Sequence, residues 1–421
     1  MFADSPSTPL TIDDERFARD LQALGEIGWA GAEGMQRTSF SAAHTEARRW
    51  LFARAKDAGL DTRVDAAGNH SAVLAAADPE APTVLLGSHL DSVPSGGRLD
   101  GALGVLAALE VVRSVKDAGL SLPVSLEAVD LTDEEGTFVG TLGSWALAGQ
   151  LTPEMLRAPR SGREAMLDAL RRQGLTEEGV LSGARRDPAT IAAFLELHIE
   201  QGPVLERVGA QIGIVTGIRG NASFQIAFHG AARHAGTTPM EDRRDAGLGA
   251  AELIVGIREL VTRDFPGCVA NVGDVRLYPG AFNVVPELAR VKLEVRSLDD
   301  RELDALSDAA RELAGRVAER WGLGLELDAV GRWAPALTDE RARRAIAGAA
   351  QRLGYSAIEM PSGAGHDAQV MARITTTGMV FIPSRDGISH HPDEHSDLQD
   401  CINGTNVLLG AALALAADSG H

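Results

Sequence analysis

The sequence predicts an α/β protein of two domains, with a mixed, largely parallel main sheet and a smaller, inserted α+β domain. Three observations support this prediction. The 421 residues exceed the length at which a single hydrophobic core usually stops growing. Apolar runs of strand length alternate with longer helical runs, as they do in parallel sheets. The pattern changes near Gly213 and returns after Trp333, so we expect one domain over residues 1–213 and 333–421 and another over residues 214–332.

The first domain is expected to alternate helices and strands, which are recognised by their hydrophobic period. Its run Asp100–Gly119 is long enough for a buried helix, because apolar residues cover most of its faces. In chain order, the other expected elements are helices within residues 12–60, a strand pair over Asp61–Ala76, strands at Val84–Leu86 and Val124–Val129, a charged helical stretch over Thr152–Ala193, a helix at Asp339–Leu353, a strand at Met379–Ile382 and a final helix from about Asn403.

The inserted domain is expected to hold two strand–helix–strand passes. Its expected strands are Ser223–Phe228, Val269–Leu277 and Arg290–Ser297, and its expected helices are Ala246–Asp264 and Asp300–Trp321. This order of elements is typical of a compact α+β unit with a core of its own.

Composition excludes several classes of function. The formal net charge of -19 argues against binding to nucleic acid or to an anionic membrane, and the aromatic content of 4% leaves little for base stacking. The two cysteines, Cys268 and Cys401, cannot build a disulfide framework. No apolar run approaches the length of a membrane span, and the opening MFADSPSTPL lacks the features of a secretion signal. We therefore expect a cytoplasmic protein with no nucleic-acid or membrane partner.

Residues that can bind metal follow four of the apolar, strand-like runs. They are His89 and Asp91 after TVLLG, Glu134 and Glu135 after SLEAVDL, His198 after AAFLEL, and His390 after GMVFIP. In an open α/β sheet, ligands bind beyond the carboxyl ends of the strands, so these four ends can converge on one site.

His89, Asp91 and Asp100 have both a functional and an ordinary interpretation. Residues two apart in an extended chain face the same side, so Asp91 is placed to hold the ring of His89 and fix its tautomer. Asp100 precedes the buried helix among glycines, where its two carboxylate oxygens can bridge two cations. The ordinary interpretation is a turn at His89 and a helix N-cap at Asp100, which is the commoner meaning of either motif alone.

The other candidates also have ordinary interpretations. Glu134 and Glu135 point in opposite directions in extended backbone, so one can bind a metal while its neighbour acts as a general base. An exposed acidic loop is the alternative for this pair. His198 lies in an apolar strand, where a histidine is more often a core residue than a ligand. His390 follows a strand directly, which favours it over His391 in a cluster that a surface loop can also carry.

Together, His89, Asp100, Glu135, His198 and His390 form a ligand set of nitrogen and oxygen atoms without a thiolate. Such a set suits two divalent ions, Zn²⁺ first, with Mn, Co and Ni as alternatives. A carboxylate that bridges two ions, with two further ligands on each side, is typical of two-metal hydrolases.

Eight motifs point to a known family. They are GSHLDSVPSGGRLDGALGVLAALE, TDEEG, LELHIEQGPVLE, ARHAGTTPM, FNVVPE, LEVRS, SGAGHDA and GISHHPDE. In these motifs the chain resembles the M20 metallo-amidohydrolases, and within them the branch of N-carbamoyl-L-amino acid hydrolases, β-ureidopropionases and allantoate amidohydrolases. HIEQGP together with SGAGHDA is specific to this branch.

The resemblance implies a role for each matching residue of the site. It implies metal ligands at the five residues of the ligand set, with Asp100 bridging, and Glu134 as the general base. It implies that Gln201, Asn283, Arg296 and His366 contact the substrate. For Arg296, a salt bridge on a strand is the ordinary alternative.

The resemblance also implies an architecture. It implies a metallopeptidase-like catalytic domain and an inserted lid domain, which packs against its twin to form a homodimer. His234 of ARHAGTTPM is then expected to reach the active site of the partner subunit. A cis peptide bond at Asp100–Gly101 is a further expectation.

We therefore expect hydrolysis of the carbamoyl C–N bond of an N-carbamoyl-L-amino acid, giving the amino acid, CO₂ and ammonia. Allantoate amidohydrolase is the closest alternative, ahead of another M20 aminoacylase or peptidase and of a non-catalytic binding protein. After DEEG, the loop TFVGTLGSWALAG is shorter than the family's pattern, which bears on the size of the substrate and not on the metal centre.

Overall fold

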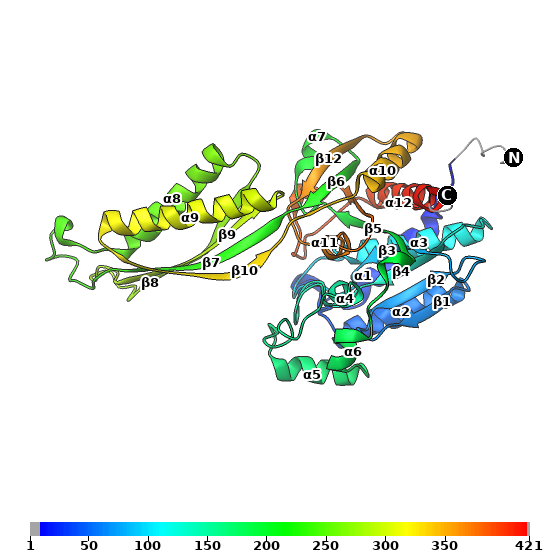
Figure 1. The fold of residues 1–421 in the computed structure, drawn as a ribbon, viewed down its shortest axis with the longest axis horizontal. Helices are drawn as coiled ribbons and strands as arrows, with labels where there is room; N and C mark the ends of the chain where they lie inside the picture. Colours follow the sequence, from blue (N-terminus) through cyan, green and yellow to red (C-terminus); the bar gives the residue numbers. More distant parts are fainter. Residues whose placement is uncertain (1–8, 419–421) are drawn as a thin grey trace. The chain divides into compact units, whose positions relative to one another are not determined.

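The computed structural model describes residues 9–418, which divide into two compact units (Figure 1). The chain passes from the first unit to the second between Thr216 and Gly217, and it returns between Ala336 and Leu337. The first unit therefore combines two separate parts of the sequence, and the second unit is one continuous insertion.

A sheet of nine strands forms the centre of the first unit. Eight strands follow the order β1-β2-β4-β3-β5-β13-β6-β11, and β12 pairs with β6. Their bounds are Asp61–Val64 for β1, His70–Leu74 for β2, Thr83–Ser88 for β3, Ser125–Asp130 for β4, Ile191–Ile199 for β5, Ile212–Ile218 for β6, Ala336–Leu337 for β11, Ala357–Ser362 for β12 and Thr377–Ile382 for β13. The four central strands, β4, β3, β5 and β13, run parallel, whereas β2 and β6 pair with them antiparallel. This mixed, mostly parallel sheet confirms the predicted fold class.

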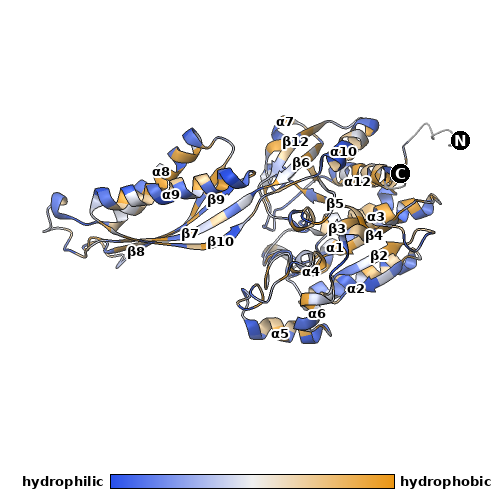
Figure 2. Cartoon of the chain, in the orientation of Figure 1, coloured by the Kyte–Doolittle hydropathy of each residue, from blue (hydrophilic) through white to orange (hydrophobic). Residues whose placement is uncertain are grey.

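The central strands are continuous apolar runs in the sequence, because helices cover them and bury their side chains. All six residues of β13 are buried, and so are five of the six residues of β3. The helix α3, Ala102–Asp117, is buried from its first residue to Val115 and packs against β3, β4 and β5. The ribbon of α3 is largely orange, which marks its apolar composition (Figure 2).

The helix α12, Leu398–Asp418, corrects one expectation. By length and composition it is apolar enough to cross a membrane, although the sequence interpretation finds no run of that length. Of its most apolar stretch of 18 residues, 72% is buried. Val407, Leu408 and Leu409 join the same core as α3, so packing within the first unit accounts for the apolar character of α12.

Eight further α-helices belong to the described part of the first unit. They are α1 Asp14–Glu26, α2 Ala42–Asp57, α4 Leu142–Leu147, α5 Arg163–Arg172, α6 Glu177–Ser182, α7 Val204–Val208, α10 Glu340–Leu353 and α11 Asp367–Met371. Side chains of Asp13, Ser41, Thr176 and Asp339 accept main-chain N–H groups at the starts of α1, α2, α6 and α10.

The expected helical stretch Thr152–Ala193 is wrong in its extent. Its α-helices are the short α5 and α6, a single 3-10 turn follows at Pro188–Thr190, and β5 already begins at Ile191. Gly162 and Gly174 adopt positive φ angles of 87° and 73°, which break the helix before α5 and after it. The charged composition therefore marks a surface segment with two short helices.

The second unit is a four-stranded antiparallel sheet with two helices, α8 Ala246–Asp264 and α9 Asp300–Trp321, on one face (Figure 1). The strand order is β10-β7-β9-β8, with bounds Gly220–His229 for β7, Val269–Tyr278 for β8, Leu288–Ser297 for β9 and Gly324–Trp333 for β10. Buried and less buried residues alternate along β7 and β9, as expected when one face packs on helices. The sequence interpretation omits β10, because its residues are mostly exposed and alternate weakly.

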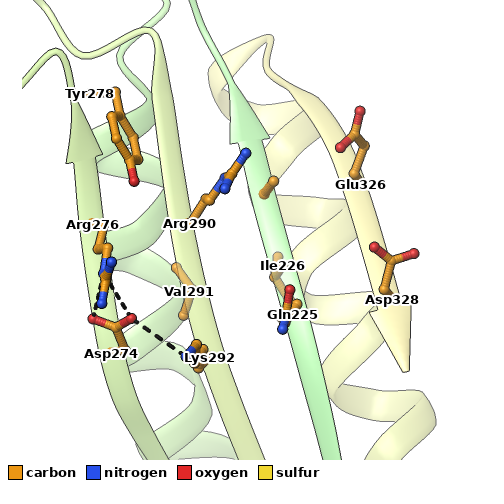
Figure 3. A pocket seen from close by; sticks show the side chains of 11 residues that line it. Gln225, Ile226, Asp274, Arg276, Tyr278, Arg290, Val291, Lys292, Glu326 and Asp328 are labelled. Atoms are coloured by element: carbon orange, nitrogen blue, oxygen red, sulfur yellow. Dashed lines mark hydrogen bonds and ion pairs between the residues drawn. The ribbon is translucent and has the colours of Figure 1, made fainter. Parts of the chain in front are cut away.

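The face of this sheet opposite the helices carries charged side chains of both signs (Figure 3). A hollow of about 320 Å³ lies there, and its charged lining residues are Asp274, Arg276, Arg290, Lys292, Glu326 and Asp328. Asp274 pairs with Arg276 at 3.1 Å and with Lys292 at 3.9 Å. None of the residues expected at the active site lines this hollow.

Gly104 allows α3 to approach the central strands. A Cβ atom at this position would lie 2.4 Å from Leu197 O and 2.7 Å from Ser88 Cβ. Gly104→Ala should therefore lower the free energy of unfolding by about 1–3 kcal/mol through overpacking, as measured by urea titration. Gly348→Ala is the control, because its Cβ would meet only the flexible end of Arg352. The control should be neutral or stabilise by up to about 1 kcal/mol, and equal midpoints for both variants would contradict this prediction.

Candidate metal centre

The carboxyl ends of four neighbouring strands meet at one edge of the main sheet. The strands β4, β3, β5 and β13 are adjacent and parallel. His89 directly follows β3, Glu134 and Glu135 lie in the turn after β4, His198 is the penultimate residue of β5, and His390 lies in the loop after β13. The topology therefore brings the four strand-end motifs together at the edge where α/β proteins bind ligands.

Asp100 lies at the centre of these residues, in the turn before α3. Its Oδ1 is 3.1 Å from His198 Nε2 and 3.7 Å from His89 Nε2. Its Oδ2 is 3.2 Å from His390 Nε2, which is 3.7 Å from Glu135 Oε2. Two groups of candidate ligand atoms result, and both include Asp100. One adds His89 and His198, and the other adds Glu135 and His390.

The turn leaves no room for a side chain directly after Asp100. Gly101 has a φ angle of 64°, and a Cβ atom there would lie 2.3 Å from His89 Cε1. Only glycine meets both conditions. Among the peptide bonds of the described residues, the cis bond is Tyr278–Pro279, so the expected cis bond at Asp100–Gly101 is wrong.

Two buried histidines present Nε2 to Asp100. Nδ1 of His89 lies 2.9 Å from the main-chain oxygen of Asp91, and Nδ1 of His198 lies 2.9 Å from that of Ile199. A carbonyl oxygen can only accept, so Nδ1 carries the hydrogen in each neutral ring and the Nε2 lone pair then faces the site. This is the tautomer that a metal-binding histidine needs.

The protonation of these histidines depends on Asp100. Burial lowers the pKa of His89 to about 4. Burial opposes the charge on His198 too, but the nearby charge of Asp100 and a hydrogen bond to it raise the pKa of His198 to about 9. The hydrogen bond to Asp100 likewise raises the pKa of His390 to about 9. A proton and a metal ion therefore compete for the same nitrogen atoms.

Glu134 is nearly buried beside His89. Its Oε2 is 3.6 Å from His89 Nε2, and its side chain is 11% exposed. Burial raises the pKa of Glu134 well above its ordinary value, and the charges of Glu135, Asp367 and Asp91 raise it further. A carboxyl group with a raised pKa is suited to accept and return a proton near neutral pH.

Asp91 orients the site through a contact that differs from the expected one. Its carboxylate oxygens accept the main-chain N–H groups of Glu134 and Glu135, at 3.3 Å each. The ring of His89 is held by the main-chain oxygen of Asp91, whereas the carboxylate is 3.9 Å from His89 Nδ1. The strand β3 ends at Ser88, so the alternation of an extended chain does not continue to Asp91.

Two of the residues expected to contact substrate lie in the first unit. Gln201 Nε2 donates to Asp100 Oδ2 at 2.7 Å and to Ser389 Oγ at 3.2 Å. Gln201 Oε1 is buried and has no hydrogen-bond partner among the described residues. The ring of His366 lies 4.6 Å from that of His198, and burial lowers the pKa of His366 well below its ordinary value. Both side chains therefore adjoin the candidate ligands.

The other two, Asn283 and Arg296, lie in the second unit, together with His234, the residue expected to act at the active site of the partner subunit. His234 forms a β-bridge with Val284, and the main-chain N–H after His234 donates to Asn283 O at 2.9 Å. The segments ARHAG and FNVVP are therefore side by side within this unit. Arg296 pairs with Glu294 at 2.6 Å, which is the salt bridge of its ordinary interpretation.

Glu394 is a residue of the site that the sequence interpretation misses. Its Oε1 accepts the main-chain N–H groups of Leu99 and Asp100, at 2.9 and 3.1 Å. The hydroxyl of Ser389 lies 3.0 Å from both Glu394 Oε2 and Asp100 Oδ2. Glu394 thus couples the loop of Asp100 to the loop of His390. Its signals in the sequence are its place at the end of the motif GISHHPDE and the acidic pair Asp393–Glu394, which surface loops also carry.

The side chains around Asp100 fit two divalent cations. They offer three imidazole nitrogens and several carboxylate oxygens at close range, which is a donor set for Zn²⁺ and similar ions. Burial raises the pKa of further carboxyl groups nearby, those of Asp91, Asp133, Glu134, Glu196 and Asp367. Buried carboxylates without matching positive charge are costly, and bound cations offset that cost.

The chain is similar to known hydrolases along most of its length. The model of peptidase family M20/M25/M40 matches residues 85–414. An N-carbamoyl-L-amino acid amidohydrolase of Geobacillus stearothermophilus is 39% identical over 96% of this chain and 99% of that protein. A ureidoglycolate hydrolase of Arabidopsis thaliana is 34% identical over 98% of this chain and 88% of that protein. The crystal structure of an amidase of the hydantoinase/carbamoylase family from Burkholderia multivorans has a TM-score of 0.90 at 35% identity, over 97% of this chain and 98% of that one.

Removal of His198 should lower the metal content of the protein. His198→Ala deletes one of the two imidazoles beside Asp100 Oδ1, so it should retain one divalent ion fewer per chain after loading and dialysis. Elemental analysis measures this. His395→Ala is the control, because His395 lies in the loop of His390 but is 45% exposed and pairs with Asp397. Wild-type metal content in His198→Ala would refute the assignment.

Metal binding should release protons below pH 9. The pKa of His390 is about 9 without an ion, so His390 is mostly protonated at pH 7 and must lose its proton to bind. The apparent affinity should therefore rise about tenfold per pH unit for each displaced proton between pH 7 and 9, and level off above that. Calorimetric titration with Zn²⁺ in two buffers of different ionisation enthalpy counts these protons. An affinity that does not change over this range would contradict the prediction.

Proposed function

The chain belongs to peptidase family M20/M25/M40, in its branch of N-carbamoyl-L-amino acid, ureidoglycolate and allantoate amidohydrolases, and from this we propose that it hydrolyses N-carbamoyl-L-amino acids. Water cleaves the bond between the carbamoyl carbon and the amino acid nitrogen, which gives the free amino acid, CO₂ and ammonia. The similarity to four N-carbamoyl-L-amino acid amidohydrolases, at 34–39% identity, supports this substrate class.

The observation that carries the proposal is the position of Asp100 between two groups of donors. In the proposed site, Asp100, His89 and His198 would hold one divalent ion, and Asp100, Glu135 and His390 would hold a second. Zn²⁺ suits this set best, and Mn, Co and Ni are alternatives. When bound, the ions supply Lewis acidity, which lowers the pKa of water and offsets negative charge on the carbamoyl oxygen.

Glu134 is the proposed general base. Its carboxylate accepts a proton from the attacking water and then delivers it to the leaving nitrogen of the amino acid. Asp91 holds the main chain from which this side chain extends, because it binds the main-chain N–H groups of Glu134 and Glu135. Nearby cations would lower the raised pKa of Glu134, so that its carboxylate is ionised when it accepts the proton.

Gln201 supports a carbamoyl group in particular. Its buried Oε1 lacks a hydrogen-bond partner among the described residues, and such an acceptor costs about 1–3 kcal/mol when unpaired. The terminal NH₂ of a carbamoyl group offers two donors for this oxygen. An N-acetyl group has a methyl carbon at the same place and offers none, which disfavours an aminoacylase.

The residues of the second unit complete the proposal. We assign the substrate carboxylate to Arg296, whose planar guanidinium can bind it through two parallel hydrogen bonds. Glu294 orients that guanidinium in the described structure. Asn283 of the same unit and His366 of the first unit are further proposed substrate contacts. His234 is proposed to act at the active site of a partner subunit, in a homodimer formed through the second unit.

A ureidoglycolate or allantoate hydrolase is the second candidate. The relative from Arabidopsis thaliana, at 34% identity over 98% of this chain, favours it. These substrates share the ureido group and the carboxylate, so the metal site and Gln201 suit them equally. The side chain on the carbon between these groups is what differs.

Product release from Zn²⁺-reconstituted protein should decide among these substrates. N-carbamoyl-L-amino acids should release ammonia and amino acid, and a chelator should abolish both. Allantoate, ureidoglycolate, N-carbamoyl-β-alanine and N-acetyl-L-amino acids should be turned over more slowly. Faster ammonia release from allantoate or ureidoglycolate would replace the proposed substrate by the second candidate, and release of amine from N-acetyl substrates alone would overturn the role of Gln201.

Glu134→Gln, assayed in the same way, should lower kcat by about 10²–10⁴-fold while both ions stay bound. Glu154→Gln is the matched control, because Glu154 is 64% exposed and pairs with Arg157. Full activity of Glu134→Gln would show that another group moves the proton.

A further inference from the structure

Arg37 is a buried arginine that no other part of the proposed mechanism uses. It is 1% exposed and is among the largest fully buried side chains of the described chain. Its Nε donates to Leu90 O at 2.7 Å, and its Nη1 donates to Leu24 O at 3.0 Å and Ile27 O at 3.1 Å. Burial lowers the pKa of Arg37 to about 10, so the side chain remains charged at neutral pH. A buried charge of this kind is costly unless its donors are satisfied.

The carbonyl that Arg37 binds lies between two residues of the metal centre. Leu90 separates His89 from Asp91. Its N–H donates to Asp130 Oδ1 at 2.8 Å, and Asp130 is itself paired with Arg48 at 2.6 Å. Both main-chain polar groups of Leu90 are thus held by buried, charged side chains from other segments.

The main chain of Arg37 holds the same loop. Its N–H donates to Ser92 Oγ at 3.2 Å, and its carbonyl accepts the N–H of Ser92 at 3.0 Å. Residue 37 therefore makes three hydrogen bonds to the segment of Leu90 and Ser92, one from its side chain and two from its main chain.

A movement of the segment from Leu90 to Ser92 would displace both the proposed ligand His89 and the proposed base Glu134. The main-chain oxygen of Asp91 holds Nδ1 of His89, and the carboxylate of Asp91 holds the main chain of Glu134. A rotation of the peptide at Leu90 therefore changes the direction of the His89 ring and the position of Glu134 together. A ligand fixed in advance binds its ion more tightly, because less freedom is lost on binding.

We propose that Arg37 is a positioning residue for the metal centre, which sets the direction of His89 and Glu134 through the carbonyl of Leu90. This inference rests on the proposed two-metal site. Arg37 lies before residue 85, where the match to the family model begins, so that match assigns it no role. Its partner Leu24 belongs to α1, and the contact thus ties the amino-terminal helix to the site.

The test is the affinity of the metal-free protein for Zn²⁺, measured by competition with a chromophoric chelator. Arg37→Met removes the side-chain donors and keeps an unbranched stem, and it should weaken Zn²⁺ binding about 10–100-fold. Arg37→Lys keeps the charge but cannot bind both segments with one ammonium group, so it should fall between Arg37→Met and the wild type. The matched control is Arg113→Met, because Arg113 is also buried but binds Asp20 and Glu110 on α1 and α3. The control should lose stability and keep its Zn²⁺ affinity.

The possible outcomes separate the two proposals. Unchanged Zn²⁺ affinity in Arg37→Met, or an equal loss in Arg113→Met, would overturn the positioning role. If Arg37→Met does not fold, the Zn²⁺ affinity of Arg37→Lys is the test instead. A wild-type affinity in Arg37→Lys would overturn the positioning role as well. A wild-type protein that binds no Zn²⁺ would instead remove the two-metal site on which the inference rests.

Discussion

The first unit is organised around one carboxylate, that of Asp100, which two groups of donors share. The two oxygens of one carboxylate can face two adjacent cation sites at once, but only if the group is held from outside the site. Gly101 removes the side chain that would collide with His89, and Glu394 binds the main chain of Leu99 and Asp100. The parallel strands β4, β3, β5 and β13 then bring the other donors to the same edge. Asp100 is therefore the residue that both groups of candidate ligands share.

The sequence predicts those parts of the site and fold that depend on local pattern. The central strands are apolar runs, and α3 is a long apolar helix, so both are visible in the hydrophobic period alone. Rules of local geometry fail where the chain turns. The alternation of an extended strand assigns the carboxylate of Asp91 to His89, whereas β3 ends one residue before His89 and the main-chain oxygen makes the contact. The strand β10 is missed because it is exposed on most of its length.

Long-range contacts are the parts that the sequence does not predict. Glu394 and Arg37 lie in segments without a clear period, GISHHPDEH and MQRTSF, and nothing local marks either residue as buried. Their partners are main-chain groups, which every residue carries, so residue types alone cannot identify the pair. For Glu394 the partner lies 294 residues away in sequence, at Asp100. Such contacts can be identified only in the folded structure, where the order of the strands brings distant segments together.

The division of the first unit by the insertion has a consequence for how the protein is made. His89, the first proposed ligand in the chain, leaves the ribosome long before His390, the last, because the whole second unit is synthesised between them. At 5–20 residues per second, the interval is roughly 15 to 60 s. The second unit, which is continuous and has its own core, can fold during that time. The strand β13 and the loop of His390 join the sheet afterwards, so the nascent chain carries an incomplete metal centre, rich in carboxylates, until the segment around His390 has been made.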